Sequence, residues 1–211
     1  MPNWCNNTFK ISASKEQIDE FEKFLEERNG KDWFDFFLPC PEELKNVGDV
    51  SAHKEPDETL VEKYGHSDWY SWNVANWGCK WNCDAQDWTR DGDEEISFWF
   101  DSPWGPPTAL YQYLSENDWN VEAQYHEEGM CFVGEFVDGE DFYYEYSDLE
   151  SLDDIPDHIV ENWNIREMLE EQAEWEDEED DSNETTEDLE QALDELKKEF
   201  DEMTKEKDDD K

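Results

Sequence analysis

Tryptophan side chains are the most concentrated chemical feature of the sequence. Four of them, Trp69, Trp72, Trp77 and Trp81, lie within thirteen residues. Indole rings can stack on single-stranded bases, but proteins that bind in this way also place Lys and Arg along the phosphates. This segment supplies one cation, Lys80. We therefore expect the indoles to form core and the floor of a pocket, and we expect no direct nucleic-acid binding.

Polar side chains set among the indoles define a candidate pocket. Such amides and carboxylates either satisfy buried backbone groups, which would make them architectural, or line a site for a small ligand. The sequence leaves both roles open. The candidate pocket residues are Asn3, Trp4, Asn76, Trp77, Lys80, Trp81, Asp101 and Trp104.

Signatures of catalysis or metal binding are weak. There is no Gly-rich phosphate loop and no nucleophile motif. Because the chain holds 62 Asp and Glu residues, two neighbouring carboxylates say little about a catalytic pair. Cys79 and Cys83 could bind zinc together with His66 or His126, but a spacing of four fits no tight knuckle. We expect no catalytic residue, no metal and no cofactor, and a binding protein is favoured over an enzyme.

Four motifs follow one another along the chain. They are Met-Pro-Asn-Trp-Cys-Asn-Asn at 1–7, Pro-x-Pro-Glu-Glu-Leu at 39–44, Tyr-x-Trp-x-x-x-Asn-Trp-Gly-x-Lys-Trp at 70–81, and Phe-Asp-Ser-Pro-Trp-Gly-Pro-Pro at 100–107. Together they resemble the YubB-like family of phage- and plasmid-borne proteins, over about residues 1–137. The resemblance implies a ferredoxin-like domain and a mobile-element origin, and it brings no catalytic residue. The chain departs from the pattern at Ser102-Pro103 and in its long acidic extension.

Acidity is the dominant global property. The formal charge is −46, from 62 acidic and 16 basic residues. Residues 170–211 hold 22 acidic and 5 basic residues, whereas residues 1–169 hold 40 and 11. The part expected to fold is thus itself strongly acidic. Such a surface repels nucleic acid and anionic membranes and favours a host protein with a basic surface, including one that normally binds DNA or RNA. Adaptation to high salt is the alternative, but it does not explain the aromatic content.

The remaining composition points to the cytoplasm of a host cell. No run of about 18 apolar residues could span a bilayer, so no membrane association is expected. The first residues lack the basic and then apolar pattern of a secretion signal. An odd, scattered set of cysteines suits reduced thiols better than disulfides; these are Cys5, Cys40, Cys79, Cys83 and Cys131.

Periodicity predicts the elements that must position these residues. Residues 7–12 alternate as a strand, and a helix follows from a capping box of Ser14 and Gln17 to a stop at Asn29-Gly30. Residues 33–41 are expected to run extended over the core. Then come a surface excursion at 45–65, a helix from a Ser67 cap to Gly78, a hairpin of strands at 81–83 and 96–100, a helix opened by Pro106-Pro107, and strands at 119–125, 131–137 and 142–146.

The order of these elements predicts an α+β fold: a ferredoxin-like (split βαβ) antiparallel sheet with extra C-terminal strands, followed by an acidic helical tail. The Trp-rich domain is expected to cover residues 1–150 and an edge helix residues 151–175. Residues 176–184 are expected to form an acidic linker, and residues 185–211 an acidic amphipathic helix and tail.

The tail supplies a second set of candidate residues. Its apolar side chains form a narrow seam suited to docking on the domain or on a partner, and a six-residue acidic run precedes it. The partner-binding candidates are Glu176, Asp177, Glu178, Glu179, Asp180, Asp181, Leu189, Leu193, Leu196 and Phe200.

Charge and resemblance together favour one hypothesis on function. It is a phage or plasmid accessory protein that acts by binding, as an acidic mimic of nucleic acid that inhibits a host defence protein, such as a restriction or CRISPR protein, or another nucleic-acid-binding protein. The alternative is a small-molecule or nucleotide-binding protein, or an enzyme, that uses the Asn/Trp/Asp pocket.

Overall fold

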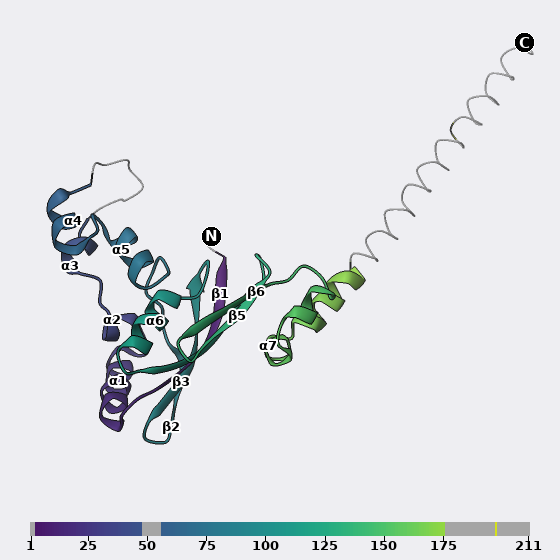
Figure 1. Cartoon of the computed structure of the whole chain (residues 1–211), viewed down its shortest axis with the longest axis horizontal. Coiled ribbons are helices and arrows are strands. Elements are labelled where there is room, and N and C mark those ends of the chain that lie inside the picture. The colour runs from purple at the N-terminus through teal and green to yellow at the C-terminus, as the bar shows by residue number, and fades with distance from the viewer. Residues whose placement is uncertain (1–2, 48–55, 176–196, 198–211) are drawn as a thin grey trace, which may run out of the picture.

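A six-stranded antiparallel sheet forms the centre of the computed structural model, which describes residues 3–47, 56–175 and 197 (Figure 1). The strand order is β2-β3-β1-β4-β5-β6. With α1 (Lys15–Arg28) after β1 and α6 (Thr108–Glu116) after β3, the first four strands follow the split βαβ arrangement. The α+β, ferredoxin-like fold with extra C-terminal strands is confirmed. The strands are β1 (Trp4–Ser12), β2 (Gln86–Asp91), β3 (Glu95–Pro103), β4 (Asn120–Glu127), β5 (Phe132–Val137) and β6 (Glu140–Glu145).

Local signals place helix α1 as predicted. Ser14 caps it, and the backbone and side chain of Gln17 complete the capping box. Asn29 ends the helix in the left-handed conformation, with φ of 52°. The buried side chains of α1 are spaced three and four residues apart, so they form one stripe against the sheet; they are Ile18, Phe21 and Leu25.

The segment after α1 is helical in part, so the prediction of an extended run over residues 33–41 was wrong. It contains the one-turn helix α2 (Phe34–Phe37), and α3 (Glu42–Lys45) follows. Trp33 and Phe34 are both fully buried. An extended chain would send these neighbours to opposite sides, whereas a helical turn keeps both in the core. The excursion predicted at 45–65 includes α4 (Glu58–Tyr64), and residues 48–55 lie outside the described residues.

Helix α5 (Trp69–Asn76) carries the Trp-rich segment. Its cap is Asp68, whose Oδ1 accepts from the Ser71 backbone N–H at 2.8 Å, and not Ser67 as expected. The strand expected at 81–83 does not form. The Asn82 side chain instead accepts from the backbone N–H groups of Phe34 and Cys83, at 3.0 and 2.9 Å, which takes those donors away from a strand ladder.

Aromatic rings fill the space between the sheet and the helices. Phe9, on the central strand β1, lies 4.8 Å from the ring of Trp33, 5.0 Å from Phe98 and 5.4 Å from Tyr111. These neighbours come from the segment after α1, from β3 and from α6. One side of the sheet is therefore covered by α1, α2 and α6 (Figure 1).

The C-terminal segment covers part of the opposite side of the sheet. It comprises η1 (Ser151–Asp154), α7 (Asp157–Asn162) and a helix over 165–175, in place of the single edge helix expected at 151–175. Val133 of β5 packs into this segment, whereas Phe136, which points to the other side, contacts Tyr111 of α6. On β4, the Nε2 of His126 lies 2.6 Å from the Tyr146 hydroxyl. None of the helices in the described ranges has the length and apolar content to cross a membrane.

Replacing Gly134 by Ala should destabilise the protein by roughly 1–3 kcal/mol, because the new methyl group is forced against packed neighbours. A Cβ at this position would lie closer than 3.0 Å to the Phe142 carbonyl oxygen and the Tyr125 hydroxyl. Urea unfolding measures the change. Gly105→Ala is the matched control, since a Cβ there meets nothing within 4 Å. Equal stability of the two variants would contradict the described packing of β5.

Stability should fall as the pH drops below about 6.5, in part through His126. Burial lowers its pKa below the ordinary value of 6.5, against the opposing effect of Glu128 and Glu127. The unfolded chain therefore binds the proton more readily, so this contribution is complete above pH 6.5 and is lost on acidification. The free energy of unfolding, compared at about pH 7.5 and 5.5, should change less in His126→Gln than in His66→Gln. The same pH dependence in both variants would refute the assignment.

Candidate functional site

The eight candidate pocket residues do not form one pocket. Trp77 is buried, with 2% of its surface exposed, and its indole N–H donates to the Leu38 carbonyl at 2.8 Å. Asn76 donates from its amide to the Trp72 carbonyl at 2.8 Å, within its own helix. Both polar groups serve the local backbone, which is the architectural role that the sequence left open.

Asn3 and Asp101, candidates from the first and the last motif, form hydrogen bonds between the segments that contain β1 and β3. The Asn3 carbonyl accepts from the Trp104 backbone N–H at 2.9 Å. Asp101 accepts from the Asn6 amide at 2.7 Å, across the β1–β3 pair. Trp4 lies on the outer side of β1 and is half exposed.

Asn7, which sequence reasoning missed, is the polar centre of this region. Its amide donates to the Cys5 carbonyl and to the Ser102 hydroxyl, each at 2.8 Å, and its Oδ1 accepts from Tyr111 at 3.3 Å. Only 1% of Asn7 is exposed. A polar residue at an inward position of an alternating strand, just before Phe9, was the available signal. Ser102, one of the departures from the family pattern, takes part in this network.

Lys80, Trp81 and Trp104 do come together, and Tyr70 joins them. The Lys80 ammonium lies 4.5 Å from the ring of Trp81, 5.3 Å from Trp104 and 5.7 Å from Tyr70. The two indoles are 5.8 Å apart. All three rings are partly exposed, so this group forms an aromatic surface with one cation at its centre.

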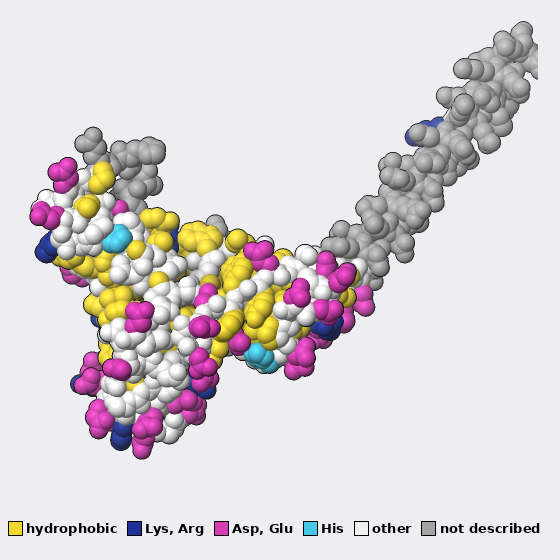
Figure 2. Space-filling model, viewed as in Figure 1, with side chains coloured by type: hydrophobic (Ala, Val, Ile, Leu, Met, Phe, Trp, Pro, Cys, Tyr) yellow, Lys and Arg dark blue, Asp and Glu magenta, His cyan; other side chains and the backbone are white. Residues whose placement is uncertain are grey.

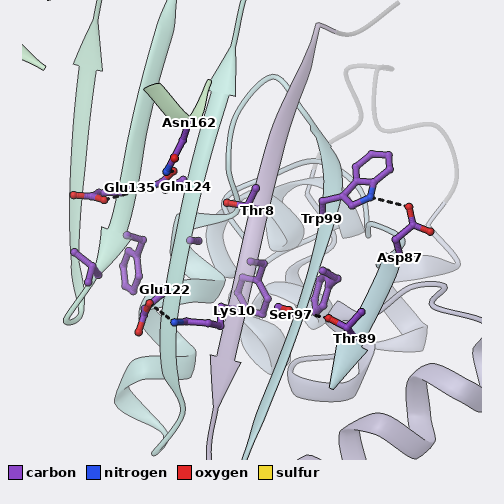
Figure 3. Close-up of a pocket in the computed structure, with 15 residues that line it drawn as sticks. Thr8, Lys10, Asp87, Thr89, Ser97, Trp99, Glu122, Gln124, Glu135 and Asn162 are labelled. Carbon is purple, nitrogen blue, oxygen red and sulfur yellow. Dashed lines mark hydrogen bonds and ion pairs between the residues drawn. The ribbon is translucent and has the colours of Figure 1, made fainter. Parts of the chain in front are cut away.

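A groove of about 480 Å³ crosses the open side of the sheet (Figure 3). Its floor is formed by outward positions of β1, β3, β4 and β5, and Asn162 at the end of α7 closes one side. Sequence reasoning did not single out these residues. The available signal was the polar residue at every second position of each strand, which marks the outward side of the sheet. The labelled lining residues are Thr8, Lys10, Asp87, Thr89, Ser97, Trp99, Glu122, Gln124, Glu135 and Asn162.

Carboxylates dominate this face of the sheet. The groove has one Lys or Arg in its lining, Lys10, whose ammonium lies 2.6 Å from Glu122 and 3.8 Å from Glu95. The hydrogen bond to Glu122 raises the pKa of Lys10, so this cation stays paired and charged. By strand register, six acidic residues point to this side: Asp91, Glu95, Asp101, Glu122, Glu135 and Glu140. Asp87, at the irregularity of β2, also lines the groove.

Few positively charged side chains are left to neutralise the acidic surface. Residues 3–47 and 56–175 contain 41 acidic and 10 basic residues, a net charge of −31. Seven of these ten cations lie within 4.0 Å of a carboxylate, as Arg90 does with Asp19 and Glu22. Acidic side chains gather near α1 and the β2–β3 turn and over the C-terminal helices, with a hydrophobic band between them (Figure 2).

A second pocket, of about 390 Å³, lies beside the indoles. It brings the candidates Trp77 and Trp81 together with residues that sequence reasoning did not select, including Asp35 and Asn73. We call it the indole pocket. Its lining consists of Asp32, Asp35, Cys40, Lys45, Trp69, Asn73, Trp77, Trp81 and Asn82.

The partner-binding candidates from Glu176 to Phe200 lie outside the described residues.

The two cysteines considered for zinc form hydrogen bonds to the backbone. Cys79 and Cys83 are both buried and donate to the same carbonyl, that of Trp81, at 3.2 and 3.8 Å. Within the described ranges, no three His, Cys, Asp or Glu side chains are arranged to hold a metal ion.

Comparison with known proteins gives little beyond this geometry. No family model and no curated protein matches the chain. A similar solved structure is the crystal structure of a protein api92 from Yersinia pseudotuberculosis, family-model DUF1281. It is 13% identical, covers 70% of this chain and 99% of its own, and superimposes with a TM-score of 0.39. Identity and TM-score are too low to carry an inference.

Trp77→Ala should destabilise the protein by about 3–5 kcal/mol, because it removes a buried indole and leaves a cavity. Trp104→Ala should cost less than about 1 kcal/mol, since 45% of that side chain is already exposed. Chemical denaturation of the two variants separates an architectural indole from a surface one. A stably folded Trp77→Ala protein would contradict the architectural role.

Proposed function

We propose that this protein acts by binding, and that the open side of its sheet receives a basic region of another protein. The observation that carries the proposal is the groove in Figure 3. Six carboxylates point to this face by register and Asp87 lines the groove beside them, whereas Lys10, the one Lys or Arg in the groove lining, is already paired with Glu122 and Glu95. Negative charge that is not balanced locally attracts a basic surface and speeds the encounter with it.

An exposed indole gives this surface an anchor. Trp99 is 41% exposed at the edge of the groove, and its N–H donates to Asp87 at 3.2 Å. Aromatic side chains surrounded by polar groups often contribute most of the binding energy of an interface. Trp99 lies on a strand with neighbours on both sides, so little ordering is needed on binding.

The partner class that fits is a protein that normally binds nucleic acid. Neighbouring strands lie about 4.8 Å apart, and side chains two residues apart on a strand about 6.7 Å. Carboxylates on such a grid can occupy cationic sites that otherwise take phosphates. With the resemblance to phage- and plasmid-borne proteins, this favours an accessory protein that inhibits a host defence or nucleic-acid-binding protein in the cytoplasm. Direct binding of nucleic acid is disfavoured, because phosphates would meet carboxylates.

Small-ligand binding is the second candidate function. It is supported by the indole pocket, which places three tryptophans beside polar side chains. That pocket and the groove share no lining residue, so the two functions can be tested separately.

Immobilised full-length protein should capture host proteins from a bacterial lysate, and duplex DNA or added salt should release the specific partner. Release by both agents is expected because the interface is electrostatic and the DNA competes for the same basic surface. The triple variant Asp87→Asn, Glu122→Gln and Glu135→Gln should weaken capture of that partner by roughly tenfold.

The control is Glu20→Gln with Glu26→Gln, which removes charge from exposed positions on α1, away from the groove. Capture that resists both DNA and salt would overturn nucleic-acid mimicry. An equal loss in the control variant would show that overall charge, and not the groove, determines binding. A retarded oligonucleotide band at low salt would favour direct nucleic-acid binding instead.

A further inference from the structure

We infer that the indole pocket binds a cationic nitrogen group, either a guanidinium or an alkylammonium. The inference rests on the walls of the pocket, on its unused hydrogen-bond acceptors and on its charge. It rests on the second candidate function, small-ligand binding, and is independent of the first, because the pocket shares no residue with the acidic groove.

Three indoles form the aromatic walls. Trp69, Trp77 and Trp81 all line the pocket, yet among the described residues no two of these rings are in contact with each other. Trp77 is held rigidly by the hydrogen bond to Leu38 and by edge-on contact with Phe34, at a centroid distance of 5.2 Å. The three rings thus line the pocket separately, and aromatic rings attract cations. Lys80, 4.5 Å from Trp81, already makes such a contact within the chain.

Two oxygen atoms of the lining residues lack a donor. Within the described part of the chain, Oδ1 of Asp35 and Oδ1 of Asn73 are buried and accept no hydrogen bond. Asn73 is 5% exposed, and its amide donates to the Lys80 carbonyl at 2.8 Å, which fixes the orientation of the side chain. A buried acceptor without a donor destabilises the folded state. Both oxygens are closed to solvent, so a ligand that supplies N–H groups reaches them only when the two side chains turn toward the pocket. Such a ligand is a hydrogen-bond donor.

The charge around the pocket selects a cation over a neutral donor. Asp35 is already paired with Arg28 at 3.5 Å and with Lys45, the one lining cation, at 3.7 Å. Asp32 also lines the pocket, and within the described ranges no cation lies within 4.0 Å of its carboxylate. Burial raises the pKa of the Cys40 thiol to about 11, so this lining residue is neutral at physiological pH. Residues 3–47 and 56–175, with their net charge of −31, add a negative potential.

Two sources can supply this chemistry: a free small cation, or an Arg or Lys side chain of a protein. Calorimetric titration of the full-length protein with N-acetyl-arginine methylamide tests the chemistry, and N-acetyl-citrulline methylamide is its neutral control of the same shape. A nine-residue peptide with one central arginine tests the source. We expect the arginine compound to bind at least about tenfold more tightly than the citrulline compound.

Asp35→Asn and Trp81→Ala should each weaken binding of the arginine compound by about tenfold. Trp81 is 37% exposed, so its removal leaves the core intact and keeps the test valid if Asp35→Asn fails to fold. The matched controls are Asp153→Asn and Trp175→Ala, exposed residues that line neither the indole pocket nor the groove, and both variants should bind the arginine compound as the unmodified protein does.

Equal affinity for arginine and citrulline would overturn the inference, as would an equal loss of affinity in the two control variants. Stronger binding of the peptide than of the blocked amino acid would support a protein side chain as the natural ligand. Equal binding of the two would support a free cation. Because no groove residue lines this pocket, failure here is distinguishable from failure of the proposed function.

Discussion

Contact of aromatic rings around Phe9 is the interaction on which the rest of the structure depends. Trp33 reaches Phe9 from the segment after α1, and Tyr111 reaches it from α6. The contact between Trp33 and Phe9 therefore also holds in place the segment that brings Asp32 and Asp35 to the indole pocket. Because hydrophobic residues make up 36% of the chain, a few large rings must supply most of the buried apolar area. The aromatic content is thus a requirement of folding before it is a property of any site.

Electrostatic repulsion opposes this core and shapes the surface. Arg90 of β2 pairs with Asp19 and Glu22 of α1, which ties the hairpin to the helix layer. Cations used in this way stabilise contacts between elements and are no longer free to neutralise an exposed face. The open side of the sheet keeps Lys10 among its outward residues, enclosed by acidic partners. The acidity of this face and the attachment of the hairpin to α1 therefore both follow from where the few cations lie.

Predictions succeeded where a local interaction determines the structure. The capping box at Ser14 and the alternation of β1 required no distant contact, and the order of such elements was enough for the ferredoxin-like fold. The prediction of a strand at 81–83 failed because the Asn82 side chain binds the backbone of Phe34, 48 residues away. Trp77 and Trp81 of the indole pocket were identified from their density in the sequence. Asp35 and Asn73 were not, because only tertiary packing brings α2 beside α5.

Two buried asparagines differ in how many of their polar atoms form hydrogen bonds. Asn7 uses both ends of its amide, in bonds to Cys5, Ser102 and Tyr111. Asn73, equally buried, uses only its donor. Among the described residues four buried side-chain atoms lack partners, and two of them belong to the lining of the indole pocket. Since native proteins rarely leave such groups unpaired, the two oxygens distinguish the lining of the indole pocket from the fully bonded network around Asn7.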